Sequence, residues 1–144
     1  MNFKFSDNLP MIVVIVFFVG GAVVLGSRFV SPSSGTVIEV RMPKLSALAA
    51  DGKIVFDENC ASCHGESGAG SKQGPPLVHN IYNPGHHADE AFFRAARNGV
   101  PRHHWQFGNM PPQPDVTREN LAKIIRYVRE LQRANGIFYQ RHVM

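Results

Sequence analysis

The sequence predicts an all-α protein in which one apolar helix precedes a helical domain of roughly 100 residues. Three observations support this fold class. Twenty residues without a formal charge lie between Asp7 and Arg28, and residues 88–100 and 117–136 both carry apolar side chains at helical spacing. With 44% hydrophobic residues the chain can bury a core. A domain of this size gains much from a bound metal or covalent cofactor, so such a group is expected.

The uncharged run near the N-terminus is long enough, as a helix, to cross about 30 Å of hydrocarbon. A cleaved signal peptide is the alternative interpretation. Its apolar region is shorter, however, and it ends in a small-x-small site, which Pro32 interrupts at the nearest candidate position. We therefore expect residues 1–28 to hold a short cytoplasmic N-terminus and a retained transmembrane anchor, which brings the chain into contact with membrane lipid.

Residues 29–46 are expected to link the anchor to the domain. They begin with the turn-forming residues SPSSG (31–35) and continue as GTVIEVRMPKL (35–45), in which apolar and polar side chains alternate. Alternation of this kind is typical of an extended segment. The linker is too short to let the domain move far from the membrane surface.

The charge of the chain argues against nucleic-acid binding. The formal net charge is +4, but the basic residues are spread along the sequence and form no basic tract. We expect a mildly basic surface and no nucleic-acid partner.

The chain's two cysteines, Cys60 and Cys63, lie in the hexapeptide CASCHG, and His64 follows the second cysteine directly. A redox dithiol would be followed by a helix within a βαβ unit, but a glycine-rich loop comes next. A structural zinc site would need a second pair of ligands, and no other cysteine exists. The remaining histidines could supply such a pair, but none has a zinc-finger spacing relative to Cys60 and Cys63. The C-x-x-C-H pattern favours covalent attachment of a c-type haem, with thioethers from both thiols and His64 as an axial iron ligand.

Residues 47–134 resemble the small single-haem cytochromes c of class I. The stretch DGKIVFDENCASCHG is similar to the N-terminal helix of that family as it runs into the haem loop. In the family a glycine and an aromatic residue of this helix pack against an aromatic residue of the last helix, and Gly52, Phe56 and Tyr127 match this set. The resemblance implies a cytochrome c fold around one covalently attached haem c.

The last helix can be predicted from its residues alone. Apolar side chains recur at helical spacing in TRENLAKIIRYVRELQRANG: Leu121, Ile124, Ile125, Val128 and Leu131. Thr117 is placed to cap its start and Gly136 to end it. The other face is basic and is expected to be exposed to solvent: Lys123, Arg126, Arg129 and Arg133.

The resemblance also implies the second iron ligand. The family supplies a methionine from a loop just before the last helix, and GNMPP (108–112) places Met110 there. The two prolines that follow keep the loop from becoming helical. In KQGPPLVHN, Pro75 matches the family's proline whose carbonyl accepts a hydrogen bond from the other ring nitrogen of the axial histidine.

Histidines are unusually dense around the predicted helix at 88–100: His79, His86, His87, His103 and His104. The helix is about 18 Å long, so the two adjacent pairs meet only if the loop folds back. A copper or zinc site, a haem with two histidine ligands, and surface or propionate contacts are the three interpretations. Arg102, His103 and Trp105 are candidates to donate hydrogen bonds to the haem propionates.

These features and the resemblance imply a membrane-anchored bacterial cytochrome c that transfers single electrons and is not itself an enzyme. Haem of this type is attached outside the cytoplasmic membrane in the family. We therefore expect a single-pass protein of the bacterial cytoplasmic membrane with its haem domain in the periplasm. The expected donor is a quinol:cytochrome c oxidoreductase, and the expected acceptor is a terminal oxidase or reductase.

Alternatives stay open at this point. In the first alternative, the chain is a fixed haem subunit of one membrane or copper-containing oxidoreductase, or the dedicated electron donor to it. In the second, Met110 dissociates and the open iron reacts with peroxide or binds a gas. In the third, the histidine pairs handle an accessory metal. Residues 135–144 lie outside the family core and are expected to form a C-terminal extension that docks a partner or wraps the domain.

Overall fold

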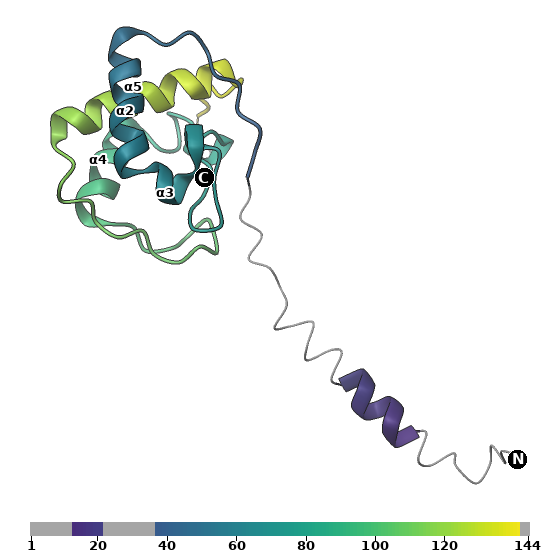
Figure 1. Cartoon of the computed structure of the whole chain (residues 1–144). Coiled ribbons are helices and arrows are strands. Elements are labelled where there is room, and N and C mark those ends of the chain that lie inside the picture. Colours follow the sequence, from purple (N-terminus) through teal and green to yellow (C-terminus); the bar gives the residue numbers. More distant parts are fainter. Residues whose placement is uncertain (1–12, 22–36, 142–144) are drawn as a thin grey trace, which may run out of the picture. The chain divides into compact units, whose positions relative to one another are not determined.

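The computed structural model describes residues 13–21 and 37–141, which belong to two compact units, Met1–Ser34 and Gly35–Met144. Residues 13–21 form a helix (Figure 1). Within the described residues, no helix is both long enough and apolar enough to cross a membrane. The rest of the predicted anchor lies outside the described residues, in 1–12 and 22–28.

In the described part of the larger unit, the regular elements are all helices joined by loops, which confirms the predicted all-α class for this domain. The elements in chain order are α2 (Ala47–Asn59), α3 (Ala61–His64), η1 (Glu66–Gly68), η2 (Asn80–Tyr82), α4 (Asp89–Asn98) and α5 (Arg118–Ala134). Among residues 37–141, extended pairing is limited to one isolated antiparallel bridge between Val100 and Met110. The helix predicted within 88–100 is therefore present as α4.

Helices α2 and α5 cross each other and form the main packing contact of the domain (Figure 1). At the crossing, a Cβ on Gly52 would lie 2.0 Å from the carbonyl oxygen of Lys123, so only glycine permits this approach. Beside it, the rings of Phe56 and Tyr127 are fully buried with centroids 5.5 Å apart. The predicted packing of Gly52, Phe56 and Tyr127 is confirmed.

The predicted ends and core face of α5 are also confirmed. Thr117 Oγ1 accepts a hydrogen bond of 3.2 Å from the Asn120 N–H, and Gly136 follows the helix with a φ of +79°. The predicted apolar residues of α5 are all buried: Leu121, Ile124, Ile125, Val128 and Leu131. The expectation that Arg129 faces solvent was wrong, because its side chain packs against the loop before α4 and is only 9% exposed.

The segments before α2 and after α5 lie against the domain. The Arg41 N–H donates to Asn135 Oδ1 at 2.8 Å, and Asn135 Nδ2 donates to the Arg41 carbonyl at 2.9 Å. On the other end, Ile137 is buried, and the Gln140 N–H donates to Asn83 Oδ1 at 3.3 Å. For the described residues 37–45 and 135–141, the structure shows a wrap around the domain.

Candidate functional site

A cavity of about 440 Å³ lies between the CASCHG turn, α4 and the loop that precedes α5. Its walls are mostly apolar, with Phe56, Leu77 and Phe92 among the lining side chains. A cavity of this size and character suits a small organic cofactor. Every residue predicted to hold haem lines it: Cys60, Cys63, His64, Pro75, Arg102, His103, Trp105 and Met110.

The two cysteines sit on a single turn at the end of α2. The Cys60 N–H donates to the Phe56 carbonyl at 2.8 Å, and α3 then carries Cys63 and His64. Both side chains are unpaired thiols. Burial, with a smaller effect from the neighbouring Cys63, raises the pKa of the Cys60 thiol to about 11. A raised thiol pKa is the opposite of the lowered pKa that activates the attacking cysteine of a redox dithiol.

The glycine-rich loop that follows the motif folds back onto it. The Gly70 N–H donates to the His64 carbonyl at 2.6 Å, and a Cβ on Gly65 would lie 2.1 Å from the Gly70 carbonyl oxygen. A Cβ on Gly74 would lie 2.8 Å from the Cys63 carbonyl oxygen. These glycines allow the chain to close around the haem turn and deliver Pro75 to the cavity. The sequence pattern showed the glycines but not this function.

His64 is held in a defined tautomer. Its Nδ1 lies 2.9 Å from the Pro75 carbonyl oxygen. Because a carbonyl oxygen only accepts, Nδ1 carries the hydrogen, and Nε2 keeps a lone pair for a metal. Burial lowers the pKa of His64 despite the opposing hydrogen bond to Pro75, so the ring is neutral at neutral pH.

Met110 is fixed by its backbone rather than by its side chain. It exchanges two hydrogen bonds with Val100, from the Val100 N–H at 3.0 Å and from its own N–H at 2.9 Å. Gly99 precedes this bridge with a φ of +71°, and a Cβ there would lie 2.6 Å from the Met110 carbonyl oxygen. The bridge ties the loop before α5 to the end of α4, and sequence reasoning did not foresee it.

The cavity fits a covalent haem. It joins two thiols, an imidazole with an available Nε2 and a thioether sulfur in one apolar space. Trp105 Nε1 is buried next to the side chain of Tyr82, and among the described residues no acceptor meets hydrogen-bond geometry with it. A propionate carboxylate would satisfy this orphaned donor. Arg102 and His103 are exposed at the cavity, and His103 Nδ1 already donates to the Pro101 carbonyl at 2.9 Å.

Comparison with known proteins decides the family. The sequence pattern of cytochrome c matches residues 49–132, more than half of the chain. The chain belongs to the cytochrome c family. It therefore carries covalently attached haem c, and Cys60 and Cys63 are consistent with the family's C-x-x-C-H attachment.

A curated relative of this cytochrome c is the cbb3-type cytochrome c oxidase subunit FixP of Bradyrhizobium diazoefficiens. The two are 30% identical over 112 residues, which cover 74% of this chain and 39% of the relative. The cytochrome thus spans less than half the length of that relative. No solved structure matches the chain.

The two histidine pairs of the cytochrome meet beside the haem cavity, because the loop after α4 folds back toward the loop before it. Nε2 of His86 is 3.1 Å from Nε2 of His104, and the rings of His87 and His103 are stacked with centroids 6.2 Å apart. Burial lowers the pKa of His87, and the neighbouring histidines lower it further against a hydrogen bond to Ile81. His87, His103 and His104 line the haem cavity.

His79 belongs to a different local structure. Its Nδ1 accepts a hydrogen bond of 3.2 Å from the Ile81 N–H and thereby caps η2. Its ring packs edge-on against Trp105, with centroids 5.1 Å apart. His79 therefore stabilises the loop structure and is not among the residues that line the cavity.

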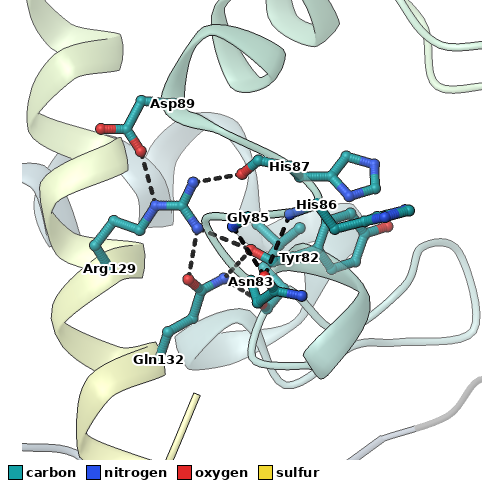
Figure 2. A network of polar contacts seen from close by, with 9 residues as sticks. Tyr82, Asn83, Gly85, His86, His87, Asp89, Arg129 and Gln132 are labelled. Atoms are coloured by element: carbon teal, nitrogen blue, oxygen red, sulfur yellow. Dashed lines mark hydrogen bonds and ion pairs between the residues drawn. The ribbon is translucent and has the colours of Figure 1, made fainter. Parts of the chain in front are cut away.

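Arg129 of α5 holds the loop that carries His86 and His87. Its guanidinium donates to Asp89 Oδ1 at 2.8 Å, to the Tyr82 carbonyl at 2.8 Å, to Gln132 Oε1 at 2.7 Å and to the His87 carbonyl (Figure 2). Four acceptors thus surround one buried cation: the Asp89 carboxylate pairs its charge, and the four bonds use four of its five N–H donors. The sequence held an indication that Arg129 is buried. Position 129 is eight residues after Leu121, which places it with the apolar residues of α5.

Proposed function

We propose that this cytochrome c transfers single electrons, with its haem bonded to Cys60 and Cys63 and the iron ligated by His64 Nε2 and Met110 Sδ. The proposal rests mainly on one observation: backbone hydrogen bonds fix both candidate iron ligands, His64 and Met110, at the cavity. The Pro75 carbonyl holds His64 in the ligating tautomer, and the bridge to Val100 holds Met110. Both side chains line the same apolar space.

Haem c supplies the one-electron couple of its iron. The protein residues then have two tasks. The apolar wall around Phe56, Leu77 and Phe92 excludes water from the haem face. Two ligands on constrained backbone keep the coordination the same in both oxidation states and leave no position for a substrate. Electron transfer to and from a haem held here, without bond chemistry, is the activity this arrangement would support.

The proposed function can be tested on the purified, haem-loaded protein. A reduced pyridine haem spectrum with haem retained through acid–acetone extraction identifies covalent haem c. A potentiometric titration should follow a single one-electron curve, and the ferric protein should show the far-red absorption band of methionine bound to iron. A high-spin ferric spectrum and rapid binding of added cyanide would instead support an open iron that reacts with peroxide or binds a gas.

We further propose that residues 1–28 anchor the cytochrome in the bacterial cytoplasmic membrane and that its haem domain, residues 47–134, lies in the periplasm. The uncharged run between Asp7 and Arg28 supports the anchor, and its described part, residues 13–21, is helical. Cell fractionation tests this placement. The full chain should remain with membranes after a high-salt wash, and a variant that carries a cleavable signal in place of residues 1–28 should be released as a soluble periplasmic protein.

A second candidate function is that of a fixed haem subunit in a membrane oxidase. The identity to the cbb3-type oxidase subunit favours it over the freely exchanging carrier between a quinol:cytochrome c oxidoreductase and a terminal oxidase or reductase. Size-exclusion chromatography after mild detergent extraction separates the two. A subunit elutes with the oxidase at constant stoichiometry, whereas a carrier elutes alone.

A further inference from the structure

Three histidines from two loops present ring nitrogens to one another. His86 and His87 precede α4, and His104 follows it. One ligand atom from each lies within 4.8 Å of the other two, and Nε2 of His86 is 3.1 Å from Nε2 of His104. Because α4 separates the two loops in the sequence, tertiary structure brings these imidazoles together.

The distance between His86 and His104 is close to that required by a shared metal ion. Two nitrogens bound at about 2.0–2.1 Å to one ion lie about 3.3 Å apart in a tetrahedral site and about 2.9 Å apart as neighbours in the square-planar geometry that Cu²⁺ prefers. In the structure the two Nε2 atoms share one hydrogen at 3.1 Å, and an ion would replace it. The ligand atom of His87 lies within 4.8 Å and would reach the same ion after a small side-chain adjustment.

His87 is held in a tautomer that binds metals. Its Nδ1 lies 2.7 Å from the Ile81 carbonyl oxygen, so Nδ1 carries the hydrogen and Nε2 keeps its lone pair. Histidines that ligate metals almost always make such a bond through their other ring nitrogen. The same arrangement holds His64 against Pro75 at the haem cavity.

The backbone that carries His86 and His87 is fixed from two sides. Asn83 Oδ1 accepts hydrogen bonds from the Gly85 N–H at 2.9 Å and the His86 N–H at 3.2 Å. The guanidinium of Arg129 donates to the His87 carbonyl (Figure 2). A metal site needs ligands on a supported backbone, and these contacts supply that support.

We propose that His86, His87 and His104 bind one late first-row transition-metal ion, with Cu²⁺ bound most tightly. Imidazole suits copper, zinc and nickel, and affinity among the divalent ions peaks at Cu²⁺. The group contains no carboxylate, so it does not suit Mg²⁺ or Ca²⁺, which take oxygen ligands. His103 lies beside the site, with its ring centroid 4.3 Å from that of His104, but it does not belong to the group of three.

The metal site and the haem cavity share a wall. His87 and His104 belong to both, so a cation bound there adds positive charge next to the haem. Positive charge stabilises reduced iron over oxidised iron and raises the reduction potential. The site would thus adjust the potential of the carrier according to the metal available. The metal-binding proposal itself does not depend on which residues ligate the haem iron.

Metal titration of the haem-loaded full chain tests the proposal. The protein is purified in detergent without a polyhistidine tag, stripped with a chelator and titrated with Cu²⁺ in a calorimeter. We expect one Cu²⁺ per haem, weaker binding of Zn²⁺, and a loss of affinity of more than about tenfold in His104→Gln and in His86→Gln. His79→Asn is the matched control, because it replaces a nearby histidine outside the group and keeps a capping acceptor.

A second measurement keeps the test independent of folding defects. Zn²⁺, which is redox-inert, should raise the haem potential of the wild type and of His79→Asn but leave that of His104→Gln unchanged. His104 is exposed, so its replacement should not alter the far-UV circular dichroism. Equal Cu²⁺ affinity in the wild type and His104→Gln, or no stoichiometric binding to the wild type, would overturn the proposal and leave the histidines as propionate or surface contacts.

Discussion

His64 and His87 each donate Nδ1–H to a backbone carbonyl, at 2.9 Å to Pro75 and at 2.7 Å to Ile81, but their surroundings are built differently. His64 belongs to a turn whose cysteines, glycines and proline lie within one short stretch of sequence. His87 depends on α5, because Arg129 donates to its carbonyl from 42 residues away in the chain. The haem turn is therefore a local structure, whereas the histidine cluster (His86, His87, His103 and His104) is a tertiary one. Changes to distant residues should damage the second far more than the first.

The largest expected effect is the loss of covalent haem from the local structure. We expect Cys60→Ala/Cys63→Ala to retain no haem on a denaturing gel stained for peroxidase activity, because both thioether positions are gone. Ser62→Ala, which alters an exposed residue of the same turn, should stain like the wild type.

A double substitution in the histidine cluster is the counterpart of the double cysteine variant. His86→Ala/His87→Ala should keep its covalent haem, because neither residue belongs to the attachment turn. Persistent staining in the double cysteine variant, or loss of staining in the double histidine variant, would contradict the distinction between a local haem turn and a tertiary histidine cluster.

The next largest effect is expected at the residue that supports the cluster. Arg129→Leu leaves the His87 carbonyl and Gln132 Oε1 without the Arg129 donor, and the Tyr82 carbonyl keeps only its bond from Gln132 Nε2. This loss should lower the free energy of unfolding by about 2–4 kcal/mol. Thermal unfolding followed by circular dichroism measures this loss. Arg133→Leu, an exposed position one turn further along α5, should cost less than about 0.5 kcal/mol.

Arg129→Leu also distinguishes the two regions directly. Below its melting temperature the variant should bind Cu²⁺ less tightly than the wild type, while its far-red haem band stays unchanged. If the variant instead lost the far-red haem band and kept its copper affinity, the conclusion that Arg129 supports the loop of His86 and His87 would be wrong.

The smallest effect concerns Glu130, which supports the start of α2. Partial burial opposes its ionisation, but hydrogen bonds from the N–H and hydroxyl of Ser46 and from Arg126 outweigh this and lower the pKa of the Glu130 carboxyl. A depressed folded-state pKa contributes stability above the pKa of the unfolded chain, and this contribution is lost as the pH falls through the folded-state value.

Glu130→Gln should therefore be less stable than the wild type by about 1 kcal/mol at pH 7, and the difference should shrink as the medium is acidified below the ordinary glutamate range. Urea denaturation at several pH values measures it. Copper affinity should not change, since Glu130 contacts α2 and not the loops of the cluster. A stability difference independent of pH would contradict the role assigned to the carboxylate.

The sequence could predict those parts of the fold that depend on the spacing of residues within a single helix or turn. The apolar stripe of α5, its cap at Thr117 and the C-x-x-C-H turn are of this kind. The packing of Gly52 and Phe56 against Tyr127 was predictable only through the resemblance to a family, in which the first and last helices of the domain cross. The resemblance to a family supplied the order in which these elements meet.

Contacts that depend on how loops fold back could not be predicted in the same way. No local pattern indicates that Val100 pairs with Met110, or that His104 returns to His86. Arg129 shows a further limit, because charge suggested an exposed residue while its helical position placed it on the buried stripe. The burial of a cation depends on acceptors from another segment, here the Tyr82 and His87 carbonyls, and these are not visible in the helix itself.

The measurement that tests the central claim most directly is the ferric absorption spectrum of the wild type beside that of Met110→Ala. If Met110 and His64 ligate the iron, the wild type shows the far-red band of methionine ligation. Met110→Ala should lose that band, bind added cyanide rapidly and keep its covalent haem. Retention of the same spectrum in Met110→Ala would contradict the account and would assign the second axial position to another residue.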